Sequence, residues 1–592
     1  MVRFGGLRAG GWIGFLAFLL SAGPGTPLPA AEQSAKPASG QSGALVLHMR
    51  ARIAADADAA TDAHPPGVAV VAGSATSERA TQAEANRPIG NGSAAPRAGM
   101  SLDEAAARLV SPAAKVVFET VEWNPQETAV IVCDMWDDHW CSSAAARVAE
   151  MAPRMNQFLS ALRGRGVLVV HAPSGTMEHY KDYPQRKRAL DAPAAKFDPP
   201  ARGWCKLDPQ REAPLPIDDQ AGGCDTPGLE QRRAWRKQID ALEIAPEDAI
   251  GDGVDVLNLF SHRGIRNVML VGVHTNMCVL GRPFGIRQLV YQGKRVVLVR
   301  DLTDAMYDPA AAPKISHFGG TARVVAHIER YWCPTIESSD ILGGAPFRFR
   351  GDRRPRVVFL INEDEYRAEE TLARWAADLE FRRDFSTTVL QGRGAFRLDG
   401  IEALREADAA VLYIRRRPIP ADQLDVLRRY LADGRPLLAL RTASHAFAVR
   451  AGAAVPEGVE NWPDFDREVL GCEYRNHAGN ALGSDIFPAA AIDEPLLHGV
   501  EPLRWHSRGS LYLSKLLDPN ARVLLKGKAG ELIEPVAWTR TYGKSRVFYT
   551  SLGHPDDFEQ QQFRQLLENA LCWLLQIDGF APQPTPAAAP GG

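Results

Sequence analysis

Two residues with reactive side chains stand where predicted strands end. Asp134 follows the apolar run TAVIVC, and Cys278 follows the run NVMLVGV and the turn HTNM. A cysteine that opens a helix after a buried strand gains from the helix dipole, which lowers the thiol pKa and favours the thiolate. An acid at a neighbouring strand end could act as its general base. The pair predicts nucleophilic chemistry. The alternative is that Cys278 is a small buried hydrophobe and Asp134 a helix cap.

Other polar residues follow the same two runs. They are Asp138 and His139 after the first run, and His274, Thr275 and Asn276 in the turn before the cysteine. The backbone N–H groups of that turn could hold an oxyanion, and we interpret all five residues as pocket or oxyanion residues. No CxxC spacing or Cys/His cluster typical of zinc occurs in the sequence, so we expect no metal and no cofactor.

The elements that position these residues alternate between strand and helix from residue 128 onward. Strands are predicted at 128–136, 166–173, 267–275 and 295–305, and helices at 144–166, 254–265 and 282–294. Near-continuous Val, Leu and Ile strands with intervening helices indicate an α/β domain with a doubly wound parallel sheet. Right-handed crossovers place the strand C-termini at one edge, where ligands bind in such sheets.

The motifs AVIVCDMWDDHW, LVGVHTNMCV and VVLVRDLTDAM together resemble the isochorismatase-like cysteine hydrolase superfamily, over roughly 125–340. The resemblance implies a Rossmann-like fold and hydrolysis of a non-peptide C–N bond in a small amide. The family's triad is an Asp, a Lys and a Cys. By motif position Asp134 matches the acid and Cys278 the nucleophile. The resemblance also implies a cis peptide at Val273–His274.

The triad lysine has no counterpart at its usual position. The matching stretch ALEIAPEDAIGDGVDVLNLF contains no Lys and offers Glu247, Asp248 and Asp252 instead. Lys237 upstream and Lys206 in the segment GWCKLDP are the candidates for the missing cation. An acid in place of the lysine would raise the thiol pKa and oppose attack. The insertion at about 180–240 is expected to form a lid or wall over the site.

A second α/β unit begins near residue 356. Its motifs LLALRTASHAF, EYRNHAGN and AWTRTYGKSRVFYTSLGH resemble the trehalose-utilisation (ThuA-like) family, over roughly 355–576. The resemblance implies a flavodoxin-like fold shared with class I glutamine amidotransferases, whose nucleophilic Cys is absent from RTASHAF. Ser444, His445, His477 and His554 are the candidate pocket residues of this domain, and the alternative is that the histidines are structural. Ser444 and His445 are neighbours, so on a strand they would face opposite sides and form no dyad.

The termini differ in composition from these two domains. Arg3 and Arg8 before GWIGFLAFLL and an Ala-rich zone are typical of an export signal, which predicts a periplasmic or secreted protein. The predicted organisation is a signal peptide at 1–31, a mostly disordered region at 32–112, an isochorismatase-like domain at 113–340, a linker at 341–355, a ThuA-like domain at 356–578 and a disordered tail at 579–592. Within the second region, 44–53 alternates like a strand and is expected to pair with 115–123.

Composition narrows the class of partner. The chain has 592 residues and a formal net charge of -3, without the basic stripe of a nucleic-acid-binding protein. No run after the N-terminus is long enough to span a bilayer. We expect a small-molecule substrate, carbohydrate-related for the second domain, with no nucleic acid and no membrane partner. By analogy with the family, the chain could also form a homo-oligomer. Among the eight cysteines, Cys205 and Cys224 are a plausible disulfide pair within the insertion, and the sequence leaves the connectivity open.

Two functional readings remain open at this level. The first is an exported enzyme that hydrolyses a small amide through Cys278. The second is a non-catalytic protein that binds a small molecule or sugar, or acts as a scaffold, and has lost the lysine-dependent chemistry. A cation beside Asp134 and Cys278 would favour the enzyme.

Overall fold

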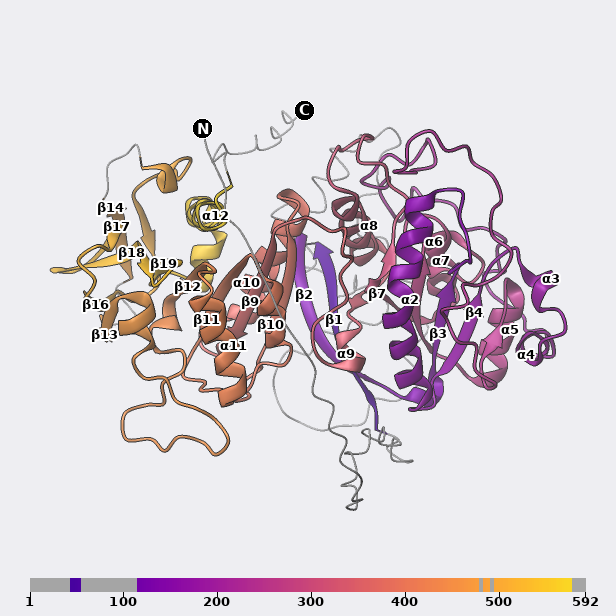
Figure 1. The fold of residues 1–592 in the computed structure, drawn as a ribbon, viewed down its shortest axis with the longest axis horizontal. Coiled ribbons are helices and arrows are strands. Elements are labelled where there is room, and N and C mark those ends of the chain that lie inside the picture. The colour runs from indigo at the N-terminus through magenta and orange to yellow at the C-terminus, as the bar shows by residue number, and fades with distance from the viewer. Residues whose placement is uncertain (1–42, 55–113, 479–482, 490–493, 578–592) are drawn as a thin grey trace, which may run out of the picture. The chain divides into compact units, whose positions relative to one another are not determined.

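The computed structural model describes residues 43–54, 114–478, 483–489 and 494–577. The predicted signal peptide, the low-complexity region apart from its strand, and the C-terminal tail lie outside these residues. Within the described part, no helix is both long and apolar enough to cross a membrane. Two large sheets and their helices make up the fold (Figure 1).

The first sheet has the strand order β2-β1-β8-β7-β6-β3-β4-β5. Its strands are β1 (Leu45–Ala54), β2 (Ala114–Trp123), β3 (Thr128–Cys133), β4 (Leu168–Ala172), β5 (Ala249–Ile250), β6 (Asn267–Val273), β7 (Arg295–Asp304) and β8 (Thr335–Ile336). The six strands from β8 to β5 are mutually parallel. Numbered along the chain, their order is the 3-2-1-4-5-6 order of dinucleotide-binding folds, and the order reverses between β3 and β6.

Helices cover both faces of this sheet. They are α2 (Ser142–Arg163), α3 (Met177–Tyr180), α4 (Pro184–Leu190), α5 (Val254–Arg263), α6 (Cys278–Gly281), α7 (Ile286–Tyr291), α8 (His317–Tyr331) and α9 (Ser339–Leu342). Alternate residues of each strand point to opposite faces. Val130 and Val132 of β3 pack with α2, whereas Ala129 and Ile131 pack with α5, α7 and α8. The predicted helix at 282–294 begins later, at Ile286.

The predicted pairing of the N-terminal strand is confirmed. β1 and β2 form an antiparallel ladder that runs from Leu45 opposite Trp123 to Ala54 opposite Ala114. β1 also joins the edge of the parallel sheet through β8. Arg50 and Arg52 of β1 both donate to the buried carboxylate of Glu329 on α8, with N–O distances of 2.7 and 3.1 Å. Strand β1 is therefore part of the first domain.

The second sheet is mixed, with the order β10-β9-β11-β12-β19-β18-β17-β14-β15. Its elements are β9 (Arg356–Asn362), α10 (Ala368–Arg382), β10 (Ser386–Gln391), β11 (Ala409–Ile414), α11 (Ala421–Ala432), β12 (Leu437–Leu440), β14 (Ser484–Pro488), β15 (Trp505–Ser507), β17 (Arg522–Ala529), β18 (Leu532–Tyr542), β19 (Ser545–Thr550) and α12 (Gln561–Leu575). β13 (Cys472–His477) and β16 (Tyr512–Leu516) form a separate antiparallel pair. The parallel part has the 2-1-3-4-5 order of flavodoxin-like folds. The antiparallel strands that extend it were not predicted.

Candidate active site

Asp134 and Cys278 lie at the point where the strand order of the first sheet reverses. Asp134 directly follows β3, and Cys278 is the first residue of α6, which follows the neighbouring strand β6. In open parallel sheets this point is where ligands bind. Asp134 is fully buried and has a positive φ of 46°, a conformation that few residues other than glycine adopt. Cys278 is 8% exposed.

A cation lies beside both residues, and it is Arg282. Its Nε is 3.3 Å from Oδ2 of Asp134, and its guanidinium also interacts with the thiol of Cys278. The Cys278 thiol interacts directly with the Asp134 carboxylate. Asp134 Oδ1 accepts a hydrogen bond of 2.7 Å from the backbone N–H of Ser174. The chain therefore places an acid, a thiol and a permanent cation together.

The resemblance does not predict Arg282, because the family's cation is a lysine at a different position in the chain. The sequence held a usable signal, since Arg282 lies four residues after Cys278. Residues four apart on a helix lie on the same side, one turn away. The two predicted lysines are elsewhere: Lys237 pairs with Asp240, and Lys206 is exposed.

The resting thiol is protonated rather than ionised. Burial raises the pKa of Cys278 well above its usual value, and the neighbouring Asp134 carboxylate raises it further. Burial also raises the pKa of Asp134, against the opposing charge of Arg282. The prediction that the helix dipole lowers the thiol pKa is wrong, because α6 has only four residues and Asp134 adds a negative charge. A nucleophilic role for Cys278 would therefore need a base, and the Asp134 carboxylate lies directly against the thiol.

The turn before the nucleophile is held by hydrogen bonds on both sides. The peptide bond between Val273 and His274 is cis, as predicted. The N–H of Thr275 donates to the carbonyl of Asp304, and the N–H of Met306 donates to the side chain of Asn276, both at 2.9 Å. Within the described residues the backbone N–H of Cys278 has no acceptor, so it is free to bind an oxyanion.

The two predicted pocket histidines are neutral. His274 is buried, its Nε2 has no partner within the described residues, and burial lowers its pKa to about 3. His139 meets it edge-on at 5.1 Å between ring centroids, and burial lowers its pKa to about 4. Asp138, by contrast, is exposed, and its carboxylate accepts the N–H of His139.

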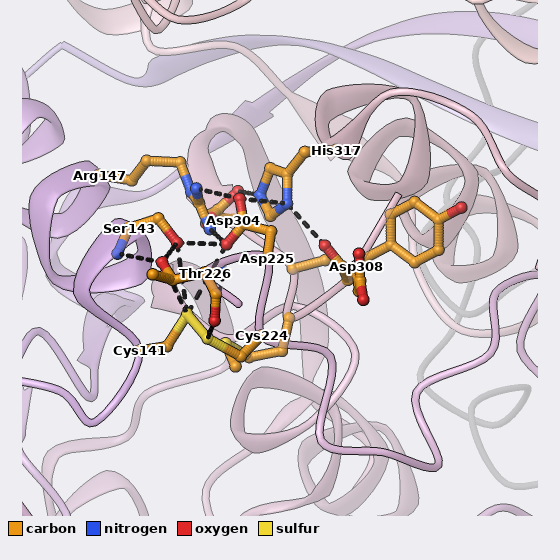
Figure 2. Close-up of polar contacts among 12 residues, drawn as sticks. Cys141, Ser143, Arg147, Cys224, Asp225, Thr226, Asp304, Asp308 and His317 are labelled. Carbon is orange, nitrogen blue, oxygen red and sulfur yellow. Dashed lines mark hydrogen bonds and ion pairs between the residues drawn. A yellow bond between two sulfur atoms is a disulfide. The ribbon is translucent and has the colours of Figure 1, made fainter. Parts of the chain in front are cut away.

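A buried network of charged side chains lies beside the turn that precedes Cys278 (Figure 2). Arg147 on α2 binds Asp304 at 2.7 Å and Asp225 at 2.8 Å, and His317 on α8 binds Asp304 at 2.8 Å. His317 and Arg147 hold the pKa of Asp304 well below its usual range. Because Asp304 also accepts the N–H of Thr275, this network fixes the turn that carries Cys278.

The insertion forms a wall beside the site. Trp204 lies over the guanidinium of Arg282 at 5.5 Å, and the N–H of Cys205 donates to the carbonyl of Gly281 at 2.7 Å. A Cβ on Gly281 would lie 2.7 Å from the Trp204 ring, so glycine permits this close approach. Farther along the insertion, Trp235 stacks on Trp136 at 4.2 Å.

The disulfide differs from the expected pair. Cys141 at the start of α2 is bonded to Cys224, 83 residues later, and Cys205 is a free, buried thiol. Figure 2 shows this bond beside Ser143 and Thr226, next to the charge network. The expected Cys205–Cys224 bond is wrong because Cys205 instead lies against Gln288, with its Sγ 3.4 Å from the amide oxygen. The observed bond ties the insertion to the start of helix α2.

Three of the predicted residues of the second domain, Ser444, His445 and His477, lie near Tyr512 or near one another. Ser444 and His445 lie on the short helix Arg441–His445 rather than on a strand, and the Ser444 hydroxyl is 3.1 Å from Nδ1 of His445. The expectation that they face opposite sides is therefore wrong. His445 and His477 both flank Tyr512, with ring centroids 6.3 and 6.2 Å from it.

His554 lies on the other side of this group. Its side chain accepts from the N–H of Asp556 and so caps the short helix Pro555–Glu559. Its ring is 6.2 Å from that of Tyr366. Across the part of the chain that the structure describes, no three His, Cys, Asp or Glu residues are grouped as a metal site would require.

Comparisons with known proteins divide along the same two domains. Residues 356–574 match the family model for trehalose utilisation (ThuA), so this part of the chain is a ThuA-like domain, as predicted. No curated protein matches the chain.

Three solved structures are among those to which parts of this chain are similar. A ThuA-like protein from Bacteroides uniformis is 14% identical, with 39% of this chain and 95% of that chain covered and a TM-score of 0.30. A cysteine hydrolase from Pseudomonas syringae is 18% identical, with 37% and 92% covered and a TM-score of 0.23. An isochorismatase family protein from Burkholderia thailandensis is 16% identical, with 30% and 79% covered and a TM-score of 0.18.

Proposed function

We propose that the first domain is a cysteine hydrolase that cleaves a non-peptide C–N bond in a small amide. One observation carries the proposal: Arg282 stands beside Asp134 and Cys278, where the resemblance calls for a lysine. A cation at this place keeps the Asp134 carboxylate ionised and stabilises negative charge that develops on sulfur and on the substrate oxygen.

The residues support a two-step acyl transfer. The sulfur of Cys278 attacks the amide carbon while its proton passes to Asp134, and the oxyanion is stabilised by the backbone N–H of Cys278. The C–N bond then breaks, and the leaving amine or ammonia takes the proton from Asp134. Water, deprotonated by Asp134, hydrolyses the thioester and releases a carboxylic acid and the free thiol.

The raised pKa values fit this sequence of proton transfers. A carboxylate with a raised pKa is a stronger base, and it lies directly against the thiol that must lose its proton. Because the thiol is neutral at rest, its proton is removed only when a substrate is in place to receive the sulfur. The neutral ring of His274 adds no competing charge.

Ammonia release from a panel of small amides, including nicotinamide and N-carbamoyl amino acids, tests the proposal. Cys278→Ser and Asp134→Asn should abolish the release, and Arg282→Gln should lower kcat by about a hundredfold. Arg282→Lys, which restores the family's side chain, should retain more activity than Arg282→Gln. The matched control is Arg263→Gln, which removes an exposed arginine from the end of α5 and should change nothing. Release that persists in Cys278→Ser contradicts the proposal.

A non-catalytic binding role is the second candidate. The observation in its favour is the near-complete burial of a thiol whose pKa is raised well above its usual value. On this reading the domain binds small amides without turnover. Calorimetric binding of an amide that the protein leaves intact, with equal affinity in wild type and Cys278→Ser, would support it over hydrolysis.

We further propose that the protein is exported and that its second domain takes a carbohydrate-related ligand. Residues 1–31 have the composition of a signal peptide. The bond between Cys141 and Cys224 requires an oxidising compartment to persist. The ThuA family description, trehalose utilisation, supports the ligand class. Cell fractionation with N-terminal sequencing of the mature protein tests export, and an intact Met1 in the cytoplasmic fraction would contradict it.

A further inference from the structure

Arg441 is a buried cation at the ligand-binding edge of the second sheet. It directly follows β12, with a positive φ of 43°, at the sharp turn where a class I amidotransferase would have its cysteine. The side chain is 1% exposed. An arginine cannot act as a nucleophile, so this turn is suited to binding.

The guanidinium of Arg441 has hydrogen bonds, but no carboxylate of the described residues forms an ion pair with it, and the buried Asp557 interacts with its charge only from farther away. Its two terminal nitrogens donate to the carbonyl of Ser551 at 2.9 Å and to the hydroxyl of Ser510 at 3.1 Å. Its Nε is buried without a partner, and no carboxylate of the described residues lies within ion-pair distance of it. A buried charge that lacks an opposite charge is costly, and a bound anion would remove that cost.

Tyrosine rings enclose this guanidinium on two sides. Its central carbon is 4.1 Å from the ring centroid of Tyr366 and 4.8 Å from that of Tyr512. Tyr474 continues the wall, with its ring 4.8 Å from Tyr512 and 4.9 Å from His445. Tyr366 and Tyr474 are half-buried, so the wall reaches the surface. Aromatic faces of this kind stack on flat rings.

A second arginine without a carboxylate partner stands nearby. Arg416 follows β11, and its N–H donates to the carbonyl of His445 at 3.0 Å. Burial and the charges of Arg416, Arg415 and Arg441 lower the pKa of His445 to about 3. His445 is therefore neutral and surrounded by positive charge. The neighbouring Arg415 is neutralised by Asp364 and Glu365.

The backbone at Gly509 passes close to the guanidinium of Arg441. A Cβ on Gly509 would lie 2.8 Å from a terminal nitrogen of Arg441 and 3.3 Å from Cβ of His554. Glycine thus lets the segment before β16 pass close to the guanidinium. Oδ2 of Asp557 accepts the N–H groups of Gly553 and His554 at 2.9 and 3.0 Å, and the charge of this carboxylate also interacts with that of Arg441.

From the buried, unpaired Arg441 and its tyrosine wall, we propose that the second domain binds a small organic carboxylate whose acid group is attached to a ring. The carboxylate pairs with Arg441, and the ring stacks on Tyr474, which is half-buried and reaches the surface. The site is independent of the hydrolysis proposed for the first domain. It narrows the ligand class proposed for the second domain, and the two statements can fail separately.

Calorimetry on the full-length protein with two matched pairs of probes tests the proposal. Benzoate is compared with benzyl alcohol, and glucuronate with glucose, so that each pair differs chiefly in the carboxylate. At least one acid should bind about tenfold or more tightly than its neutral partner. Binding of benzoate without glucuronate would support the carboxylate site and count against a carbohydrate ligand.

Variants assign the binding to Arg441. Arg441→Met should weaken binding of the acid by at least about tenfold. Arg374→Met removes another arginine of the same domain, one that is paired with Glu559, and should bind as wild type does. Arg282→Gln, which disables the first-domain site, should also bind normally.

Three results would overturn the proposal. They are no binding of either acid, equal binding of the neutral partners, and undiminished binding by a folded Arg441→Met. If inorganic phosphate binds more tightly than both acids, the site is a phosphate site and the proposal of a carboxylate ligand is wrong. If Arg441→Met does not fold, the comparison of the acids with their neutral partners in the wild-type protein still tests whether the site binds a carboxylate.

Discussion

Replacing Arg282 by glutamine should destabilise the first domain, and the structure allows the size of this effect to be calculated. Its Nε lies 3.3 Å from the carboxylate of Asp134, which is fully buried, whereas the Arg282 side chain is 25% exposed. At an effective dielectric constant of about 20, two unit charges at that distance attract by about 5 kcal/mol. In Arg282→Gln the carboxylate keeps the N–H of Ser174 but loses its counter-ion.

Protonation of Asp134 limits how much stability the Arg282→Gln variant can lose. An ordinary aspartate has a pKa of about 3.9, so its protonation at pH 7 costs about 4 kcal/mol, which is the upper bound on the destabilisation. We expect Arg282→Gln to destabilise the first domain by about 3 kcal/mol at pH 7. In the variant the folded-state pKa of Asp134 is raised further above the unfolded value, so stability falls as the pH rises. The loss should therefore shrink towards about pH 4.

Hydrogen exchange of the β3 and β6 amides, followed by mass spectrometry, measures this loss in the first domain alone. Arg263→Gln is the control. The double variant Asp134→Asn with Arg282→Gln should recover most of the stability, because a neutral amide needs no counter-ion. A loss below about 1 kcal/mol at pH 7, or losses that simply add in the double variant, would refute the reasoning.

Three further predictions concern the insertion and the pH dependence. Hydrogen bonds from His327 and Arg287 lower the pKa of Glu212 to about 2. The stability that the ionised Glu212 adds to the folded domain should therefore be lost as the pH falls from about 4.5 to about 2. Acid unfolding curves should show this loss in the wild type and not in Glu212→Gln. Opening the 83-residue loop by Cys224→Ser should cost about 4 kcal/mol and expose the insertion to trypsin; unchanged cleavage would count against its anchoring role. The rate of hydrolysis should decline with falling pH through a pKa above that of an ordinary aspartate, because Asp134 must be ionised, and a pH-independent rate would exclude it as the base.

The sequence predicted those parts of the fold that depend on local patterns. The Val- and Ile-rich runs of β3 and β6 form the expected parallel strands, and the ladder between β1 and β2 follows from their alternation. Because the ends of parallel strands meet at one edge, the sequence also predicted that Asp134 and Cys278 would lie together. These inferences need only the periodicity of one segment and the handedness of crossovers.

Features that depend on distant contacts were missed. Cys141 was not paired with Cys224 because the insertion has no periodic pattern that would show where it returns to the sheet. The protonated state of Cys278 depends on burial, which the helix-dipole argument ignores. Arg441 was not predicted as a site residue because its burial depends on two tyrosines, Tyr366 and Tyr512, from separate segments of the chain.

The central claim is that Asp134 takes the proton of Cys278 with Arg282 beside them, and iodoacetamide labelling tests it without knowledge of the substrate. Peptide mapping gives the alkylation rate of Cys278 at neutral pH in wild type and in Asp134→Asn. Loss of the base should slow alkylation, whereas loss of its negative charge alone would lower the thiol pKa and speed it. We predict slower labelling of Cys278 in Asp134→Asn. Labelling that is unchanged or faster would contradict the assignment of Asp134 as the base.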